Sequence, residues 1–343
     1  MKPVVIVPEP IHQEGLDLLR AECDCVVPWQ GGAEQGSDAA GARPAGVREL
    51  VRGGEHSAIR QALYDADAVI VRLFKISEWD LSRAKRLKVI AKHGTGVDNI
   101  DCQAATSRRI PVVYTPTANA NAVAEHTLAL MLALSRQIAP ADSAVRGGRF
   151  GERSRFKGAE LAGKTLLVVG LGRIGSRVAR IAAQGLGMQV CAYDPLLPAE
   201  IIDSGPVTIE DSLEALLPTA DYLTIHVPLT ADTKHLINAK TLALMRPSCR
   251  LVNTSRGAVI DELALAAALS EGTLAGAALD VFEEEPLPAD HPLCRAPNTL
   301  LTPHISSSTA ESLERMSLFA AQGVLDVLHG RVPKHVVNPE VFE

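Results

Sequence analysis

The chain has 343 residues, of which 47% are hydrophobic and 22% charged, with a formal net charge of −6 at pH 7. This length and composition are typical of a globular protein with two cores, and the modest acidic balance gives no support for nucleic-acid or anionic-membrane partners. No apolar run approaches the roughly 20 residues that span a bilayer, and residues 1–7 are too short, before Pro8, to be a signal peptide. The six cysteines are scattered without zinc-binding spacing, so we expect reduced thiols, no metal site and a cytoplasmic location.

Apolar runs alternate with amphipathic stretches in the first third of the chain. Strands are expected at 4–7, 24–27, 68–71, 89–91 and 112–114, and helices at 13–21, 56–64 and 81–86. Residues 30–54 are rich in glycine and alanine without a clear period, and are expected to form a solvated insertion with a short helix near 47–51. The alternative for this insertion is a binding element.

The same alternation continues to the C-terminus. A helix at 122–137 is apolar on much of its surface and is expected to be buried, between domains or subunits, and the basic residues 146–157 are expected to form an exposed connector. Further strands are expected at 166–169, 189–193, 222–228, 250–254, 275–280 and 300–304, and helices at 174–183, 213–217, 239–245, 261–271 and 311–328. Strands that alternate with helices predict α/β architecture with parallel sheets, whose ligands lie beyond the carboxyl ends of the strands.

A glycine-rich turn joins the strand at 166–169 to the helix that follows. It has the pattern G-x-G-x-x-G, in which Gly170 permits a tight turn, Gly172 lets backbone approach a pyrophosphate and Gly175 lets the helix pack on the strand. With Arg173 and Ile174 between them, these residues would place a phosphate at a helix N-terminus, where free N–H groups favour negative charge. The turn therefore predicts a dinucleotide site.

Asp194 ends the next predicted strand, about twenty residues beyond the glycine turn. A carboxylate at this point binds the ribose 2′-hydroxyl and would repel a 2′-phosphate, so NAD is the predicted cofactor rather than NADP. The basic Arg173 nearby is the residue that argues against this preference for NAD.

Four sequence blocks resemble those of the D-2-hydroxyacid dehydrogenases: NTSRG at 253–257, ALDVFEEEP at 278–286, LTPHI at 301–305 and HGTGVDNID at 93–101. The last is similar to the phosphoglycerate dehydrogenase branch. The resemblance implies a doubly wound, parallel-sheet Rossmann domain for NAD at 118–304. This domain would be inserted in a smaller flavodoxin-like α/β substrate domain at 1–117 and 305–343, with a closing cleft between them. It also implies a homodimer, with the helix at 122–137 at the interface.

The resemblance implies a catalytic set of three residues. Arg256 would hold the substrate carboxylate and polarise its carbonyl, because a guanidinium pairs bidentately with a carboxylate. His304 would be the general acid and base at the substrate oxygen, and Glu285 would pair with it and favour its protonated form. Arg72 and the backbone N–H groups of Thr95 and Gly96 would also bind the substrate, a small anionic 2-hydroxy or 2-oxo acid.

The remaining cofactor contacts also follow from the resemblance. Asp280 would contact the nicotinamide carboxamide, while other residues would line the adenosine side or border the cofactor, namely His226, Val227, Pro228, Thr233, Thr254 and Ser255 together with Arg256 and His304. The chain departs from the family pattern after His304, where Ser306 and Ser307 replace glycines. Ser306 would lie close to the nicotinamide and add a hydroxyl there.

The predicted activity is NAD-dependent interconversion of a D-2-hydroxy acid and its 2-oxo acid. The first candidate substrate is 3-phosphoglycerate, since the block at 93–101 and the basic Arg72, Lys92 and His93 suit an anionic tail. Hydroxypyruvate or glyoxylate comes second, and a sulfonate acid is a further alternative. A formate-dehydrogenase-like activity is disfavoured by Glu285, where that relative has glutamine. An NAD-sensing corepressor-like binding protein is the alternative from another class. The chain ends soon after its last helix, so no regulatory domain is expected.

Overall fold

The computed structural model describes residues 2–30, 56–197 and 205–343. The chain divides into two compact units: unit 1 comprises Met1–Asn119 with Thr309–Glu343, and unit 2 comprises Ala120–Ser308. Both boundaries fall slightly later in the chain than the expected domain limits. The predicted insertion beyond residue 30, with its helix near 47–51, lies outside the described residues.

Unit 1 contains a five-stranded parallel sheet in the order β2-β1-β3-β4-β5, the flavodoxin-like order. Its strands are β1 (Val4–Ile6), β2 (Asp24–Val26), β3 (Ala68–Val71), β4 (Val89–Lys92) and β5 (Val112–Val113). Its helices are α1 (Gln13–Glu22), α2 (His56–Asp65), α3 (Glu78–Arg83), α4 (Cys102–Ser107) and α11 (Ala310–Leu328).

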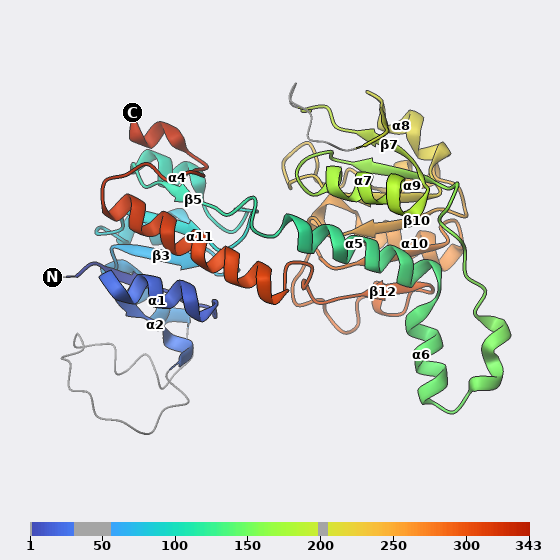
Figure 1. Ribbon diagram of the computed structural model, residues 1–343, viewed down its shortest axis with the longest axis horizontal. Helices are drawn as coiled ribbons and strands as arrows, with labels where there is room; N and C mark the ends of the chain where they lie inside the picture. Colours follow the sequence, from blue (N-terminus) through green and yellow to red (C-terminus); the bar gives the residue numbers. More distant parts are fainter. Residues whose placement is uncertain (1, 31–55, 198–204) are drawn as a thin grey trace. The chain divides into compact units, whose positions relative to one another are not determined.

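Successive residues of the unit 1 strands face two separate cores. In β3, Val69 and Val71 pack in the core shared with α3 and α4, while Ala68 and Ile70 pack in the core shared with α1 and α11. Figure 1 shows α11 running alongside α1. Gly15 permits this close approach, because a Cβ there would lie 2.7 Å from the Cβ of Ser317. Two buried faces explain the continuous apolar runs in these strands.

Unit 2 contains a seven-stranded parallel sheet in the order β12-β11-β10-β9-β6-β7-β8. Its strands are β6 (Thr165–Val169), β7 (Gln189–Tyr193), β8 (Val207–Ile209), β9 (Tyr222–Ile225), β10 (Arg250–Asn253), β11 (Gly276–Leu279) and β12 (Thr299–Leu301). Its helices are α5 (Ala120–Ser135), α6 (Ile138–Arg146), α7 (Gly175–Leu186), α8 (Leu213–Leu216), α9 (Ala239–Ala243) and α10 (Glu262–Glu271). The order reverses between β6 and β9, as in doubly wound Rossmann sheets, so the predicted fold class is confirmed.

The central strand β6 separates the two cores of unit 2. Leu166 and Val168 pack in the core that includes α5 and α7, whereas Leu167 and Val169 pack in the core that includes α8, α9 and α10. Helix α5 is therefore buried against the sheet and α7 within unit 2 itself. This packing explains its apolar surface without a second subunit.

Some local elements were missed or have other bounds than expected. The short strand β8 and the helix α6 were not predicted, and residues 150–155 of the expected connector form an exposed 3₁₀ helix. Helix α3 begins at Glu78, earlier than expected, because Ser77 and Asp80 form a capping box that stabilises the earlier start. Within the described residues, no helix is long and apolar enough to cross a membrane.

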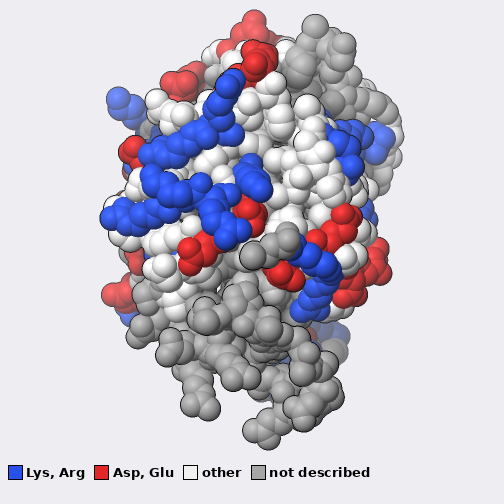
Figure 2. Space-filling view, turned by 90° about the vertical axis from the view of Figure 1, so that its left-hand side faces the viewer, with Lys and Arg blue, Asp and Glu red and all other residues white. Residues whose placement is uncertain are grey.

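Charge is unevenly distributed over unit 1. Lysines and arginines precede β4 and β5 in the chain, and Arg86 and Lys88 pair with Asp67 at 3.0 and 3.3 Å. Figure 2 shows a face on which basic side chains gather in one area, with acidic side chains around it. The local basic area exists despite the net negative charge of the chain.

Candidate active site

Most of the predicted site residues follow the strands of unit 2. They lie at the carboxyl ends of the parallel strands: Gly170 after β6, Asp194 after β7, His226 after β9, Arg256 after β10, Asp280 after β11 and His304 after β12. The parallel sheet thus brings residues far apart in sequence to one edge, where α/β proteins bind ligands.

The three glycines of the turn after β6 differ in their surroundings. A Cβ at Gly175 would lie 2.0 Å from the carbonyl oxygen of Gly170, and Gly170 itself has φ +93°. By contrast, a Cβ at Gly172 would meet no atom within 4 Å. Two glycines are therefore required by the fold, and Gly172 leaves open space beside the backbone. That space fits the pyrophosphate of a dinucleotide, with exposed Arg173 and half-buried Ile174 next to it.

Asp194 connects β7 to the glycine turn. Its Oδ2 accepts a hydrogen bond from the Leu171 N–H at 2.8 Å, and its Oδ1 accepts one from the Leu196 N–H at 3.0 Å. The carboxylate is half-buried and holds the position of the turn. Sequence reasoning had not assigned it this structural role.

The segment after β9 carries His226, Val227, Pro228 and Thr233. The Nε2 of His226 lies 3.0 Å from Thr224 Oγ1, and burial lowers the pKa of His226 to about 3, so its ring is neutral at pH 7. Thr233 donates from its hydroxyl to the Pro228 carbonyl at 2.6 Å and accepts from the Thr230 N–H at 2.8 Å. Thr233 thus holds a tight turn beside this segment.

Asn253 organises the turn that carries Arg256. Its Oδ1 accepts from the N–H and the hydroxyl of Ser255 at 2.9 and 2.8 Å, and its Nδ2 donates to the Arg256 carbonyl at 2.9 Å. Thr254 Oγ1 lies 2.8 Å from Thr127 Oγ1 on α5. A Cβ at Gly257 would lie 1.9 Å from the carbonyl carbon of Phe282, so only glycine fits between this turn and the segment after β11.

His304 and Glu285 form a direct pair. His304 Nδ1 lies 2.8 Å from Glu285 Oε2, and Glu285 Oε1 accepts from the Phe282 N–H at 3.0 Å. Burial opposes ionisation of Glu285, but its hydrogen bonds with His304 and Phe282 and the nearby positive charges of His304 and Arg256 lower its pKa overall. An ionised Glu285 fixes the ring of His304 so that Nε2 is left to exchange a proton.

Asp280 lies beneath the loop that carries His304. The side chain is fully buried, and its oxygens accept from the N–H groups of Ile305 and Ser306 at 2.9 and 2.8 Å and from the Thr302 hydroxyl at 2.6 Å. Burial opposes its ionisation, yet these bonds and His126 lower the pKa of Asp280 to about 2. Its carboxylate is therefore an ionised support for the backbone next to His304. Ser306 is buried at this support, and the hydrogen bond comes from its backbone rather than its hydroxyl.

Sequence reasoning assigned no role to three polar residues in this region. His126 on α5 lies 3.5 Å from Asp280 Oδ1 and 3.3 Å from Thr302 Oγ1, and Thr127 and Asn253 hold the Arg256 turn. The available signal was a polar run, Glu125-His126-Thr127, inside a mostly apolar helix. A buried helix carries such residues when a polar group faces it.

In unit 1, Arg72 follows β3 and Thr95 and Gly96 follow β4. The Thr95 hydroxyl donates to Asn119 Oδ1 at 3.0 Å, and the preceding Gly94 has φ +141°. The expectation that His93 adds positive charge for an anionic tail was wrong, and the Lys92 ammonium is bonded to groups of unit 1. Lys92 is buried, with its Nζ bonded to the Arg72 carbonyl and, at 2.6 Å, to Asn99 Oδ1. Burial, with the nearby charge of Arg72, lowers the pKa of His93 to about 4, so it is neutral at pH 7.

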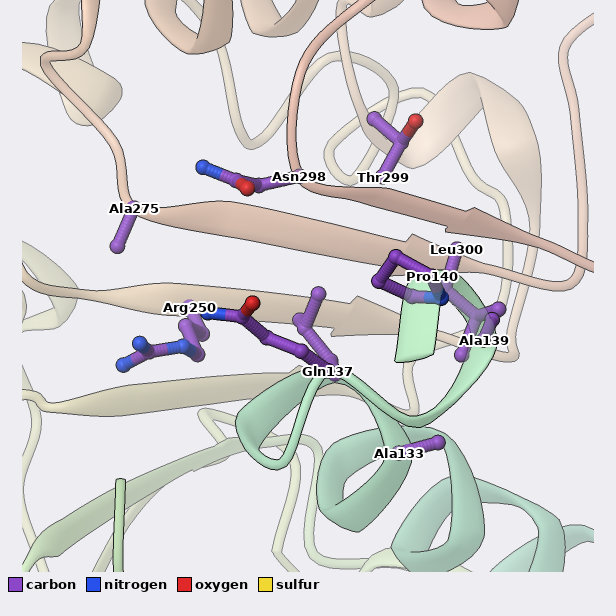
Figure 3. A pocket seen from close by; sticks show the side chains of 10 residues that line it. Ala133, Gln137, Ala139, Pro140, Arg250, Ala275, Asn298, Thr299 and Leu300 are labelled. Atoms are coloured by element: carbon purple, nitrogen blue, oxygen red, sulfur yellow. The ribbon is translucent and has the colours of Figure 1, made fainter. Parts of the chain in front are cut away.

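One cavity in unit 2 lies at the other end of the sheet. It has a volume of about 90 Å³ and lies where β10, β11 and β12 begin (Figure 3). Its lining comprises Ala133, Leu134, Gln137, Ala139, Pro140, Arg250, Ala275, Asn298, Thr299 and Leu300, and includes no predicted site residue. Among the described residues, no group of three or more histidine, cysteine, aspartate or glutamate side chains could hold a metal ion.

Comparison with known proteins identifies the family to which unit 2 is similar. Residues 128–306 match the NAD-binding domain of the D-isomer specific 2-hydroxyacid dehydrogenases. The chain is 39% identical over 335 residues to a D-3-phosphoglycerate dehydrogenase of Methanocaldococcus jannaschii, a match that covers 97% of this chain and 59% of that protein. It is also 39% identical to a glyoxylate reductase of Thermofilum pendens, covering 100% of this chain and 96% of the relative.

A solved structure extends the similarity to both units. The D-lactate dehydrogenase of Aquifex aeolicus, complexed with NAD and lactic acid, superposes with a TM-score of 0.80 at 28% identity, covering 98% of this chain and 99% of that one. The chain spans 50 to 59% of the length of the first phosphoglycerate dehydrogenases that it matches.

Proposed function

The chain belongs to the family of D-isomer specific 2-hydroxyacid dehydrogenases, and on this basis we propose that it is an NAD-dependent oxidoreductase that interconverts a small D-2-hydroxy acid and its 2-oxo acid. The observation that carries the proposal is the His304–Glu285 pair, 2.8 Å apart, at the same sheet edge as Arg256 and the open backbone at Gly172. An acid/base, a carboxylate-binding cation and a dinucleotide cradle are the three parts that this reaction needs.

In the proposed mechanism, the bound nicotinamide supplies or accepts the hydride at C2 of the substrate. Arg256 binds the substrate carboxylate and polarises the C2 oxygen. During reduction, protonated His304 donates from Nε2 to the developing alkoxide. During oxidation, the neutral ring takes the hydroxyl proton, and Glu285 holds the orientation of the ring in both directions.

The cofactor is proposed to be NAD, with Gly170, Gly172 and Gly175 around the pyrophosphate and Asp194 at the ribose. Asp194 supports NAD over NADP because a 2′-phosphate would face its carboxylate. Asp280 is proposed to act near the nicotinamide mainly through the loop that it supports, since its two oxygens already accept three hydrogen bonds of 2.6 to 2.9 Å.

Unit 1 is proposed to bind the rest of the acid through Arg72 and the backbone at Thr95 and Gly96. The first candidate substrate is 3-phosphoglycerate, in line with the relatives named as D-3-phosphoglycerate dehydrogenases. The second is glyoxylate or hydroxypyruvate, in line with the glyoxylate reductase that matches almost end to end. Lys92 and His93 are buried, so Arg72 is the cation of the three that is proposed to meet an anionic tail.

We further propose a homodimer in the cytoplasm. Helix α6 and the 3₁₀ helix after it expose large apolar side chains, with Phe150 67%, Val145 57% and Ile138 55% exposed. Exposed apolar side chains gathered in one segment mark interaction surfaces. The six cysteines are free, which is typical of reducing compartments. Sedimentation of the purified chain tests the assembly, and a monomer at micromolar concentration would contradict it.

The test of the activity is NADH absorbance with a panel of 2-oxo acids, with and without phosphate, carboxylate or sulfonate tails, repeated with NADPH. Oxidation of NADH by one of these acids is the expected result and would also identify the substrate class. Tight NADH binding with no turnover of any acid would contradict the enzyme proposal and support an NAD-sensing binding protein.

A further inference from the structure

We propose that Glu9 is a positioning residue that holds the turn carrying Arg72, and that through this turn unit 1 selects acids with an anionic tail. The inference rests on the proposed function, and assigns the selection of the tail to a carboxylate that does not itself meet the substrate. The tail is a single anionic group, such as a phosphate, carboxylate or sulfonate.

The first observation is the hydrogen bonding of the Glu9 carboxylate. It accepts from three consecutive backbone N–H groups, at 2.6 Å from Arg72, 2.8 Å from Leu73 and 3.0 Å from Phe74. Successive N–H groups that converge on one anion form a backbone nest, and here a side chain of the protein occupies it. The carboxylate therefore sets the conformation of the turn after β3.

The carbonyl side of the same turn is also held. Lys92 Nζ donates to the Arg72 carbonyl, and Asn99 Nδ2 donates to the Phe74 carbonyl at 2.8 Å and to the Arg72 carbonyl at 3.3 Å. Lys92 and Asn99 are also bonded to each other at 2.6 Å. The turn is thus held on both sides. Glu9, from the segment after β1, binds its N–H groups, and Lys92 of β4 and Asn99 from the segment after β4 bind its carbonyl groups.

The Arg72 guanidinium retains its capacity to bind an anion. Its Nη1 donates to the Pro10 carbonyl at 3.1 Å, and across residues 2–30, 56–197 and 205–343 no carboxylate forms an ion pair with it. Glu9 is adjacent but its oxygens are directed to the backbone. A guanidinium has five N–H donors, so a single carbonyl contact leaves the fork available for a phosphate or carboxylate.

The position of the turn agrees with a selective role. It lies at the carboxyl end of β3, the edge at which parallel sheets bind ligands. The neighbouring Leu73 is 64% exposed on the same turn. A single cation at this turn suits a tail with a single anionic group.

The experiment compares two substrates that differ in the tail. Steady-state reduction is measured for 3-phosphohydroxypyruvate, which has a phosphate tail, and for glyoxylate, which has none, using the wild-type chain, Glu9→Gln and Glu9→Asp. The Glu9→Gln substitution presents an amide N–H₂ to the nest in place of one acceptor oxygen, so the turn and Arg72 lose their fixed position. We expect KM for the phosphate acid to rise roughly tenfold in Glu9→Gln, with kcat and the glyoxylate KM unchanged within about twofold. Glu9→Asp keeps the charge on a shorter side chain, so its rise in KM for the phosphate acid should be smaller than that of Glu9→Gln.

Two controls separate this role from a general structural one. Glu14→Gln removes an exposed carboxylate from α1 and should leave both KM values unchanged. In an Arg72→Gln background, Glu9→Gln should add no further rise in KM for the phosphate acid, because Glu9 acts through Arg72.

The outcomes distinguish failure of the inference from failure of the proposed function. A wild-type chain that reduces neither acid nor any other in the panel overturns the proposed function, and this inference with it. An active wild type in which Glu9→Gln changes both acids equally, or changes kcat rather than KM, overturns the positioning role alone. If Glu9→Gln does not fold, Glu9→Asp and Arg72→Gln must still raise KM selectively for the phosphate acid, and an unselective effect in both overturns the inference.

Discussion

The loop after β12 and the turn after β3 are built in the same way in two different units. In unit 2, Asp280 accepts from the N–H groups of residues 305 and 306, which follow His304. In unit 1, Glu9 accepts from the N–H groups of residues 72 to 74, beginning with Arg72. Each carboxylate follows the strand that neighbours its target in the sheet, β11 beside β12 and β1 beside β3.

Asp194 provides a third example, because it follows β7 and accepts from the Leu171 N–H after the neighbouring β6. Parallel strands end at one edge, so a carboxylate after one strand reaches the free N–H groups after the next. The difference between the first two is burial. Asp280 is fully buried and accepts three hydrogen bonds, with His126 3.5 Å away, whereas Glu9 is partly exposed. The buried support should therefore matter more for stability, and the exposed one more for binding.

The largest expected effect is the loss of turnover when His304 is removed. His304→Ala should lower kcat by about a hundredfold or more while NADH affinity is kept, because general acid/base catalysis contributes on that scale. Stopped-flow reduction and an NADH titration measure the two quantities. The matched control is His329→Ala, since His329 and Glu22 form a second histidine–glutamate pair at the same 2.8 Å separation. Near-normal turnover in His304→Ala would remove its assigned role.

The next effect compares the two supporting carboxylates by stability. Asp280→Asn should lower the free energy of unfolding by about 3 kcal/mol, because an amide N–H₂ then faces buried donors, and Glu9→Gln by about 1 kcal/mol, because water reaches its site. Urea unfolding at pH 7 measures both. Equal losses of unfolding free energy in the two variants would contradict the expected difference between a buried and a partly exposed support.

The buried support at Asp280 should also make the stability of the fold depend on acidic pH. The pKa of Asp280 is lowered to about 2 in the folded chain, from an ordinary value of 3.8, so its ionisation stabilises the fold above about pH 4. That contribution, about 2 kcal/mol, should be lost as the pH falls from 4 towards 2. Urea midpoints measured from pH 5 to pH 2.5 should fall less steeply in Asp280→Asn than in the wild type. Parallel curves would show that Asp280 does not carry this dependence.

The smallest effect concerns the ionised partner of His304. Glu285→Gln replaces the carboxylate that holds the His304 ring at 2.8 Å with a neutral amide, so kcat should fall by roughly tenfold, the rate equivalent of one charge-assisted hydrogen bond. Glu9→Gln, which lies in the other unit and supports backbone, should leave kcat within about twofold of the wild type. The kcat values of the two variants decide whether the carboxylates have different roles.

Much of the architecture could be predicted from the sequence. Strands such as β3 and β7 were placed from end to end, because both faces of a parallel strand are buried and the apolar run has sharp limits. The glycine turn at 170–175 and the order of blocks around Arg256 and His304 could also be recognised. The strand β8 was missed because it is short and largely exposed, and α6 because it contains Pro140 and only two residues separate it from the end of α5.

The sequence by itself determined the types of side chain at the sheet edge and the family to which the chain belongs. Only the tertiary structure decided which side chains are available. It buried Lys92 and His93, directed Glu9 and Asp280 to backbone N–H groups, and joined His126 to Asp280 across more than 150 positions of sequence. The physical reason is that charge type is a local property, whereas burial and hydrogen-bond partners depend on which strands are neighbours.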